Sequence, residues 1–597
     1  MTVPHETQKL TALVLVLCLG AVCGCTSDPP GVGANRSSET FIGYHPDNDP
    51  LINPPELFDE YDPTRADNDA VLTRHLVGEP RNLNPIFVNS WFDFYLQRLL
   101  YGTLFYRNQD LDWVVNDERV AHMEESEDRC ITRIKLRSGQ TWHDGHPLTT
   151  ADVRFAWQMI TNDDVPSFYY KHMVSRIVDV KIIDELNLEF HHQQANPMNN
   201  MHMGFPLLPK HVFGKPEELA KDPTLSRSDY YNHYSREEVV GCGPYRFVEW
   251  RTNDRLVVER WEDYPFKKPH FKRQILKVQP DRNTALLLFK KGELDEIWLT
   301  PQQFATQSND EAYRRVGVKG FNVRRMYAYI GWNMDGSNPF FTDKRVRLAM
   351  AHAFDTDRIL RDNTYNLYTP STGIFDPDHW CYNPDVTRVP FDLDAAAKLL
   401  DEAGWLISDE DGWRYKQIDG KPVKLEWELL SAKSFHYASV AVNIYRDDLR
   451  KIGVAFRWVE VENAAFDSTY LRHEFQALLS VWEVTNDPSQ WQNHFHSRAH
   501  QGGRNVCGYK NDRVDELFDL SVSTYNRDER AKHLREAQQI IYDDQPHLFV
   551  WNYSMLHGFS KDLRGVNFSP AGVFLFNPAQ NAWWFERSQS VADNRLP

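Results

Sequence analysis

Four stretches of the chain carry the spacing of amphipathic helices, with core-forming side chains at positions i, i+3, i+4 and i+7. Thr149, followed by Asp152, predicts a capping box at the start of the first helix, and Asp343 and Asp394 are the expected caps of the next two. The four stripes are Val153, Ala156, Trp157 and Ile160; Val346, Ala349, Met350 and Ala353; Ala396, Leu399, Leu400 and Ala403; and Leu534, Ala537, Gln538 and Ile541. These stripes predict core-facing helix surfaces and indicate no chemistry.

Short apolar or alternating runs between these helices predict β-strands. The runs cover residues 131–136, 177–183, 186–190, 255–260, 423–430 and 454–461. Helices and strands alternate along the chain without an internal repeat, so we expect a mixed α/β protein. A chain of 597 residues exceeds what one hydrophobic core normally supports, which predicts two or three domains.

The first apolar run of the chain predicts an export signal. Residues 10–22 follow Lys9 and are too few to cross a bilayer. The run ends in Val22-Cys23-Gly24-Cys25, which resembles a bacterial lipobox and implies removal of residues 1–24 and a diacylglycerol on Cys25; an ordinary signal peptide is the alternative. Residues 25–66 show no sustained apolar period and predict a flexible tether. We therefore expect a protein of the cell envelope, lipid-anchored to a membrane and facing the periplasm or the outside.

Charge and composition narrow the classes of function. The formal net charge of −17, without a basic cluster, argues against binding to nucleic acid. Aromatic residues reach 13%, which suits either large cores or a ligand cleft lined by rings. Four cysteines remain beyond Cys25, and their wide spacing fits no metal knuckle and leaves their pairing open: Cys130, Cys242, Cys381 and Cys507.

Eight short motifs follow one another between Leu76 and Val566. They lie at residues 79–85 with 99–105, 136–153, 209–211, 241–247, 291–295, 341–350, 399–405 and 508–511. The most specific is LRSGQTWHDGHPLTTADV at 136–153, which is similar to LR-x-G-V-x-F-x-DG-x-PLTA-x-DV. Taken in this order, the motifs resemble the bacterial extracellular solute-binding proteins of family 5, the oligopeptide, dipeptide and nickel type.

This resemblance implies a two-lobed α/β fold of the periplasmic-binding-protein kind, large and of the peptide-binding type. A small, peptide-like solute would be enclosed between the lobes and passed to the permease and ATPase complex of an ABC importer. The protein itself would be a monomer, not an enzyme and without a cofactor. The implied boundaries are 67–110, 231–325 and 546–597 for lobe I, 111–230 for an extra subdomain of lobe I, and 326–545 for lobe II.

Two glycine motifs have a physical reason of their own. His143-Asp144-Gly145, before Pro147, predicts a turn with the glycine at positive φ. Gly241-Cys242-Gly243-Pro244 predicts a place where two backbones cross too closely for side chains, which would suit a hinge between lobes.

The ligand site is expected around Trp482. Peptide-binding members of the family carry W-x-x-D followed by a D/E-P pair, and the Asp holds the peptide α-ammonium. Here Thr485 stands at the position of that Asp, and a neutral hydroxyl cannot form the charge-assisted bond. Either Glu483 or Asp487 replaces it, or the ligand is not a free-amino peptide. Oligosaccharides, metal chelates and a sensor or scaffold role remain alternatives.

The expected ligand-binding residues fall in three groups. They are Trp482, Glu483, Thr485, Asn486 and Asp487 in lobe II; Asn89, Ser90, Trp91 and Asp93 in lobe I; and Tyr327, Tyr329 and Asn333 near the hinge.

A metal-dependent hydrolase is the rival class with the least support. His496 and His500 have i, i+4 spacing and His494 is near, but no Glu stands between them as in H-E-x-x-H. The three histidines therefore remain weak candidates for holding a metal. The chain also lacks a G-x-S-x-G elbow, a Walker loop and a dinucleotide-binding glycine loop.

Overall fold

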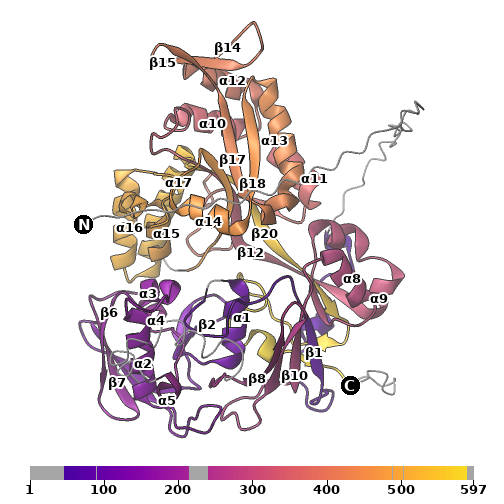
Figure 1. The fold of residues 1–597 in the computed structure, drawn as a ribbon, viewed down its shortest axis with the longest axis vertical. Coiled ribbons are helices and arrows are strands. Elements are labelled where there is room, and N and C mark those ends of the chain that lie inside the picture. The colour runs from indigo at the N-terminus through magenta and orange to yellow at the C-terminus, as the bar shows by residue number, and fades with distance from the viewer. Residues whose placement is uncertain (1–45, 89, 214–238, 487, 502, 588–597) are drawn as a thin grey trace, which may run out of the picture. The chain divides into compact units, whose positions relative to one another are not determined.

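The computed structural model describes residues 46–587 apart from 89, 214–238, 487 and 502, so the predicted signal, Cys25 and residues 25–45 of the predicted tether lie outside the described residues. Residues 46–66 of that tether are described, and within them Leu57 and Ala66 are buried against the body. A mixed sheet of eleven strands runs through the body (Figure 1). In spatial order its strands are β18 (Ala455–Val461), β17 (Glu426–Ala432), β19 (Ala477–Glu483), β12 (Gly317–Trp332), β20 (His547–Ser560), β11 (Glu296–Trp298), β1 (Val71–Leu76), β10 (Arg273–Val278), β9 (Arg255–Arg260) and β8 (Tyr245–Arg251), and β13 (Thr369–Pro370) also pairs with β20.

The long antiparallel pair β12–β20 joins the two parts of this sheet. One end of β12 pairs with β19, from Met326 to Trp332, and carries the sheet toward β17 and β18. The other end of the pair lies beside β11, where Trp298 is opposite His557. The register between β12 and β20 shifts between Val323 and Tyr327. This irregularity lies beside the predicted lobe boundary at 325/326, whereas the second predicted crossing, 545/546, precedes β20.

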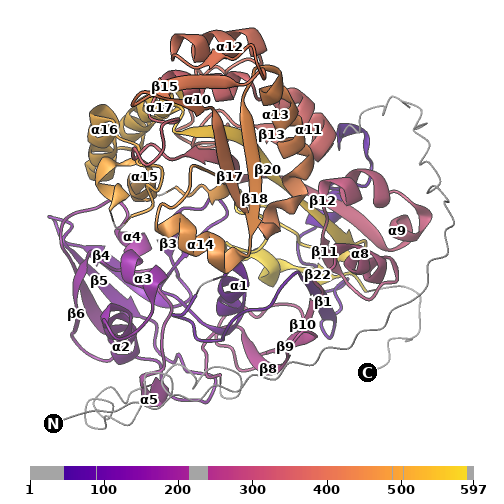
Figure 2. The ribbon, with the colours of Figure 1, turned by 45° about the horizontal axis from the view of Figure 1, so that its top comes forward.

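Residues 120–192 contribute the strands of a separate four-stranded antiparallel sheet (Figure 2). It packs with α2 around a core cluster that includes Val153, Ala156 and Phe190. The same cluster takes in Leu104 and Cys242, so this core extends beyond the bounds 111–230 predicted for the extra subdomain. Its strands are β4 (Val120–Glu125), β5 (Ile131–Leu136), β7 (Asn187–His192) and β6 (Ile177–Ile182), and its helices are α2 (Thr150–Thr161), α3 (Phe168–Met173), α4 (Asn199–His202) and α5 (Lys210–Phe213).

The remaining helices cover the large sheet. Two separate clusters pack against the part that holds β17 and β19, one around Trp427 and one around Trp491. The helices are α1 (Trp91–Leu100), α8 (Arg282–Lys290), α9 (Glu311–Val316), α10 (Lys344–His352), α11 (Thr356–Thr364), α12 (Leu393–Glu402), α13 (Ser439–Lys451), α14 (Asn463–Leu471), α15 (Pro488–Phe495), α16 (Asp512–Ser523) and α17 (Arg527–Asp544). Two short strand pairs and a small three-stranded sheet complete the described fold. The pairs are β2 (Phe105–Arg107) with β3 (Trp113–Val115) and β21 (Leu563–Arg564) with β22 (Trp584–Phe585), and the three-stranded sheet is β14 (Leu406–Ile407), β15 (Arg414–Ile418) and β16 (Lys421–Lys424).

Local predictions of helix starts hold in two of three cases. Thr149 and Asp152 form the expected capping box of α2, and Asp343 caps α10. The prediction for α12 is wrong by two residues, because the side chain of Asp392 accepts the capping hydrogen bond and Asp394 lies in the first turn. The strand predicted at 423–430 is in fact the end of β16 and most of β17.

The described cysteines beyond the N-terminal region are all unpaired, and three of the four are buried. Among the helices of the described ranges, none combines the length and apolar character needed to cross a bilayer.

The close backbone crossing predicted at Gly241 is confirmed. A Cβ on Gly241 would lie 1.8 Å from the carbonyl oxygen of Leu100, and one on Gly243 would lie 2.5 Å from that of Leu99. The crossing therefore packs against the end of α1. It does not lie at the β12–β20 pair, which joins the two parts of the sheet. His143 holds it in place: its Nδ1 accepts from the Gly241 N–H at 3.1 Å and its Nε2 donates to the Gly243 oxygen at 3.0 Å.

We expect the protein to lose stability steadily as the pH falls below about 6.5, the pKa of histidine in unfolded chains. Burial lowers the pKa of His143 to about 4 and that of His547 to about 3. Both side chains are neutral in the fold, so their contribution is complete above pH 6.5 and shrinks as pH drops toward the folded-state pKa, at about 1.4 kcal/mol per pH unit for each group. Urea midpoints measured from pH 8 to pH 4.5 test this.

The matched variants for that series are His143→Gln and His122→Gln, the second at an exposed position on β4. His143→Gln should flatten the decline, because one group that binds a proton on unfolding is removed. The exposed variant should follow the parent protein. An unchanged slope for His143→Gln would contradict the explanation.

Candidate functional site

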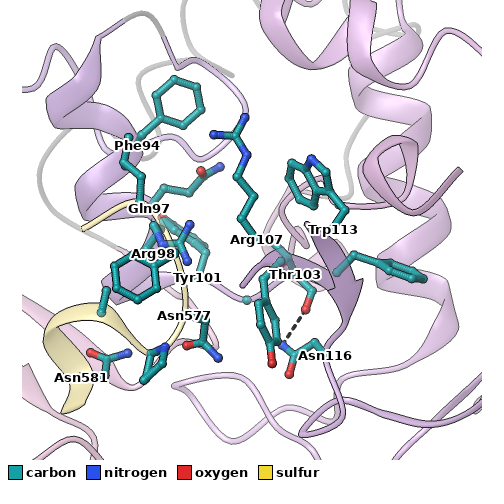
Figure 3. A pocket seen from close by; sticks show the side chains of 18 of the residues that line it. Phe94, Gln97, Arg98, Tyr101, Thr103, Arg107, Trp113, Asn116, Asn577 and Asn581 are labelled. Carbon is teal, nitrogen blue, oxygen red and sulfur yellow. Dashed lines mark hydrogen bonds between the residues drawn. The ribbon is translucent and has the colours of Figure 1, made fainter. Parts of the chain in front are cut away.

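A cavity of about 640 Å³ is lined by residues from widely separated parts of the chain. Its wall includes α1, the β2–β3 pair, the end of β19 and the segment 575–582, with further side chains from 264–268 (Figure 3). Figure 3 shows Phe94, Gln97 and Arg98 from α1 on one side and Arg107 and Trp113 from the β2–β3 pair on the other. Cavities of this size with mixed apolar and polar walls commonly hold small ligands.

The expected lobe II contacts Trp482, Glu483 and Thr485 all lie on this wall. The ring of Trp482 packs on the His494 ring, with centroids 3.5 Å apart, and Arg504 lies over it at 5.3 Å. Glu483 is already paired with two arginines, and the Thr485 hydroxyl donates to Gln490 at 2.6 Å. Trp482 thus presents one surface to the cavity while the rest of its ring packs inside the protein.

Asn486 lies beside the cavity and not on its wall. Its side-chain nitrogen donates to the Asp110 carbonyl at 2.9 Å and to the Asp112 carboxylate at 2.6 Å, and its oxygen accepts from Arg325 at 2.8 Å. Asn486 follows β19, whereas Asp110 and Asp112 lie in the connection between β2 and β3. Asn486 was predicted to contact the ligand, but its side chain instead links these two segments.

The predicted lobe I residues have mixed placements. Ser90 lines the cavity and caps α1, and Asp93 completes the capping box and accepts from the Arg81 N–H at 3.0 Å. Asp93 is buried and shapes the start of the helix without being part of the cavity wall. Asn89 and Asp487 lie outside the described residues, as does the side chain of Trp91.

The three residues predicted near the hinge are buried in the core. Tyr327 and Tyr329 are each 1% exposed and belong to a hydrophobic cluster with Trp491. Asn333 is fully buried, and its amide donates to the backbone oxygens of His473 and Phe475. None of the three lines the cavity, because the β12 residues after the register shift are covered by neighbouring strands and helices.

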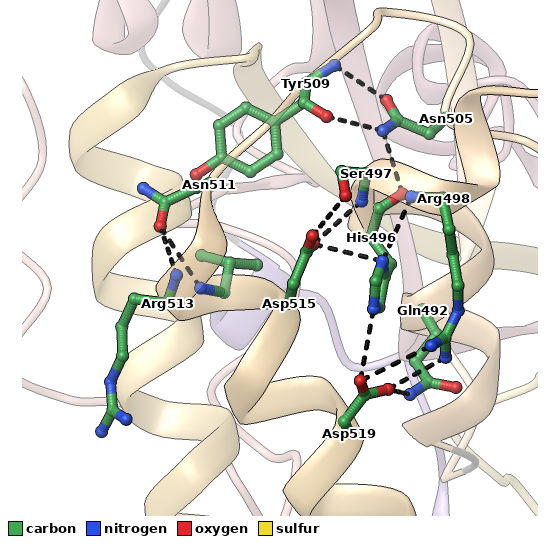
Figure 4. Close-up of polar contacts among 11 residues, drawn as sticks. Gln492, His496, Ser497, Arg498, Asn505, Tyr509, Asn511, Arg513, Asp515 and Asp519 are labelled. Carbon is green, nitrogen blue, oxygen red and sulfur yellow. Dashed lines mark hydrogen bonds and ion pairs between the residues drawn. The ribbon is translucent and has the colours of Figure 1, made fainter.

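The three histidines predicted as candidates for metal binding each contact different residues. His496 lies between two carboxylates, 3.3 Å from Asp515 and 3.5 Å from Asp519 (Figure 4). His494 packs on Trp482, and His500 contacts the Asn505 carbonyl at 3.0 Å. Their nitrogen atoms do not converge on one point, because each ring is fixed by its own contacts.

Within the described chain, one group of three side chains brings metal-ligating atoms together, namely Asp144, His146 and His211. The two imidazoles are stacked 4.0 Å apart and only 14° from parallel. Parallel rings cannot both aim their in-plane lone pairs at one ion, so this arrangement does not form a ligand set as it stands. His211 donates to Asp144 at 2.7 Å instead.

Several residues of the cavity wall carry no signal in the sequence. The segment after residue 574 contributes eight consecutive residues, among them Asn577 and Asn581, which Figure 3 labels. Tyr101 lies inside the motif at 99–105, which was recognised as structural, and Arg98 and Arg107 flank that motif on either side. An arginine inside an amphipathic helix pattern is the one sign that could have singled out Arg98.

The β12–β20 pair joins the two parts of the large sheet, and distant segments from both sides line the cavity. This arrangement is typical of two-lobed solute-binding proteins. Residues 97–503 match the family of bacterial extracellular solute-binding proteins, family 5. The chain belongs to this family, and the resemblance seen in the motifs is confirmed.

Two further comparisons concern one protein of Bacillus subtilis. The curated oligopeptide-binding protein AppA of strain 168 is 25% identical over 525 residues, which are 86% of this chain and 91% of that protein. The solved structure of AppA in complex with a nonapeptide is similar with a TM-score of 0.74 and 23% identity, covering 88% of this chain and 100% of that one.

A solved structure of NikA from Brucella suis, in complex with Fe(III)-EDTA, is similar with a TM-score of 0.72 and 18% identity. It covers 87% of this chain and 100% of the NikA chain. These likenesses confirm the predicted two-lobed α/β fold.

Proposed function

We propose that this chain is the solute-binding lipoprotein of an ABC importer, which captures a peptide-like solute in the cavity and releases it unchanged to a membrane permease and its ATPase. The anchor would be a diacylglycerol on Cys25, and the protein would act as a monomer without a cofactor or catalysis. Family membership supports the binding role, and the names of the relatives support the peptide-like ligand.

The observation that carries this proposal is the composition of the cavity wall. α1 and the β2–β3 pair follow β1 along the chain, and in the cavity they face the end of β19. In the large sheet, β1 and β19 lie on opposite sides of the β12–β20 pair. A solute in this space would contact both parts at once, so binding would favour the closed arrangement of the lobes over an open one.

We expect a thermal-shift screen to find the ligand class. Peptides, oligosaccharides and metal chelates would be added to the purified protein, and a true ligand raises the melting temperature by mass action, with about 2.7 kcal/mol of stabilisation at a hundredfold excess over Kd. Mass spectrometry should then recover the ligand unaltered. Turnover of the ligand by the protein alone would contradict the binding role.

The matched variants for this screen are Trp482→Ala and Trp413→Ala. Trp482 lines the cavity, whereas Trp413 is a half-buried tryptophan that does not line it. Loss of the cavity ring should weaken binding by about tenfold, since aromatic contacts of this kind contribute up to about 1.5 kcal/mol. Trp413→Ala should keep the parent affinity, and equal effects of the two variants would argue against the site.

A further inference from the structure

The cavity wall has the opposite charge balance to the rest of the protein. The whole chain carries a formal charge of −17. The cavity is lined by five basic side chains and two acidic ones, namely Arg98, Arg107, Arg119, Lys267 and Lys268 against Glu118 and Glu483. A basic surface inside an acidic protein is not explained by composition, so it points to what the cavity holds.

Arg98 is the least compensated of these charges. It lies in the last turn of α1, half-buried, and lines the cavity. Its guanidinium forms no ion pair with any acidic side chain among the described residues. Arg107 lines the same cavity, and burial together with the positive charge of Arg107 lowers the pKa of Arg98 to about 10. Such a pair is unfavourable in the empty protein and becomes favourable when an anion lies between or beside the two charges.

The two acidic side chains on the wall are already engaged. Glu483 lies 3.1 Å from Arg324 and 4.0 Å from Arg107, so its charge is shared by two arginines. Glu118 accepts a hydrogen bond from the Tyr264 hydroxyl at 3.2 Å, and burial raises the pKa of its carboxyl group. Neither is well placed to hold a ligand ammonium, and Thr485 replaces the aspartate that would do so.

We propose that the cavity selects acidic solutes, with a ligand carboxylate bound by the guanidinium groups of Arg98 and Arg107. Each guanidinium presents several N–H donors in one plane and matches the two oxygens of a carboxylate. For a peptide this group is the α-carboxylate or an acidic side chain, and the free α-ammonium is dispensable. The inference rests on the proposed function, because it describes what that binding site recognises.

The ligand arm of the test varies the two ends of a peptide separately. A randomised pentapeptide mixture is prepared with free ends, with an N-acetyl group, with a C-terminal amide and with both, using only residues with uncharged side chains. Forms that keep the carboxylate should bind, and the amides should bind about 10- to 100-fold more weakly, the range for a hydrogen bond to a charged group. Equal binding of acids and amides, or loss of binding on N-acetylation alone, would overturn the inference and leave the proposed function standing.

The variant arm asks whether Arg98 is responsible for the preference. In Arg98→Met the ratio of acid to amide affinity should fall toward one, while the amide affinity stays as in the parent. The melting temperature of the ligand-free variant should be unchanged or higher, because the substitution removes a charge that repels Arg107. A merely structural arginine would instead lower that melting temperature and leave the ratio intact. Arg107→Met should lower the ratio as well.

The matched control is Arg133→Met, which removes an exposed arginine from β5 that pairs with Glu189. It should leave the acid-to-amide ratio as in the parent. A loss of preference in this control would show that overall charge, and not the cavity pair, determines selection.

A non-peptide probe separates failure of the inference from failure of the peptide assignment. Adipate and its neutral diamide are tested in the same thermal-shift format. Binding of adipate but of no peptide form would keep the acidic-solute inference and end the peptide assignment. If neither adipate nor any peptide acid binds, the inference falls together with the peptide-like part of the proposed function.

Discussion

Replacement of Gly241 by alanine is expected to lower the free energy of unfolding by about 3 kcal/mol or more, the upper end for overpacking a rigid site. The added Cβ would lie 1.8 Å from the Leu100 carbonyl oxygen and 2.9 Å from its carbonyl carbon. Both atoms belong to the backbone, so no side chain can rotate away to make room. His143 hydrogen-bonds both Gly241 and Gly243, which prevents the crossing segment from moving aside on its own.

Urea denaturation of Gly241→Ala beside Gly412→Ala measures this effect. A Cβ at Gly412 meets no atom within 4 Å, and its φ of +75° is the cause of strain there. That variant should lose about 1 kcal/mol, the usual cost of a left-handed conformation for alanine. If Gly241→Ala lost no more than Gly412→Ala, the backbone crossing would be looser than the structure shows.

Replacement of Glu296 by glutamine is expected to cost about 3–5 kcal/mol of stability, as is usual when one partner of a buried ion pair is removed. The Glu296 carboxylate lies 3.2 Å from Arg74 and 2.7 Å from His557, and all three side chains are at most 1% exposed. Arg74 also lies 3.7 Å from the centre of the Phe574 ring, so its charge has no route to water. Glutamine keeps the size of the side chain but cannot neutralise that charge.

The double variant Arg74→Met with Glu296→Gln is the control for that explanation. It removes the stranded charge as well and should recover part of the lost stability, because two neutral side chains carry no uncompensated charge. Asp357→Asn, which breaks an exposed pair with Arg388, should cost less than about 1 kcal/mol. If the double variant were less stable than Glu296→Gln, the pairing of Arg74 with Glu296 would not be the source of the effect.

Elements with a clear local pattern were predictable from the sequence, and the two strands that join the parts of the sheet were not. β5 and β9 fall at the predicted residues, and Thr149 caps α2 as expected. β20 is buried on both faces for thirteen of its fourteen residues, so its sequence shows no alternation. β12 carries polar side chains that are paired with distant partners, such as Lys319 with Asp49 at 2.6 Å. Local hydropathy cannot reveal such pairs.

The candidate site was predictable to a similar degree. Trp482, Glu483 and Thr485 line the cavity. They were expected there because a family motif covers that stretch. Tyr327 and Tyr329 shared the same expectation but are covered by neighbouring elements. The wall near Asn577 and Asn581 has no local signature, since it becomes part of the site only when the end of the chain packs beside α1. Arg98 was missed because it lies just before the motif at 99–105 and no local pattern marks it as part of a cavity wall.

The crystal structure of the protein with its tightest-binding solute tests the central claim most directly. We expect the solute in the cavity, in contact with Trp482 from one lobe and with α1 from the other, and chemically unchanged. A solute bound outside this space, or electron density for a reaction product in its place, would contradict the account.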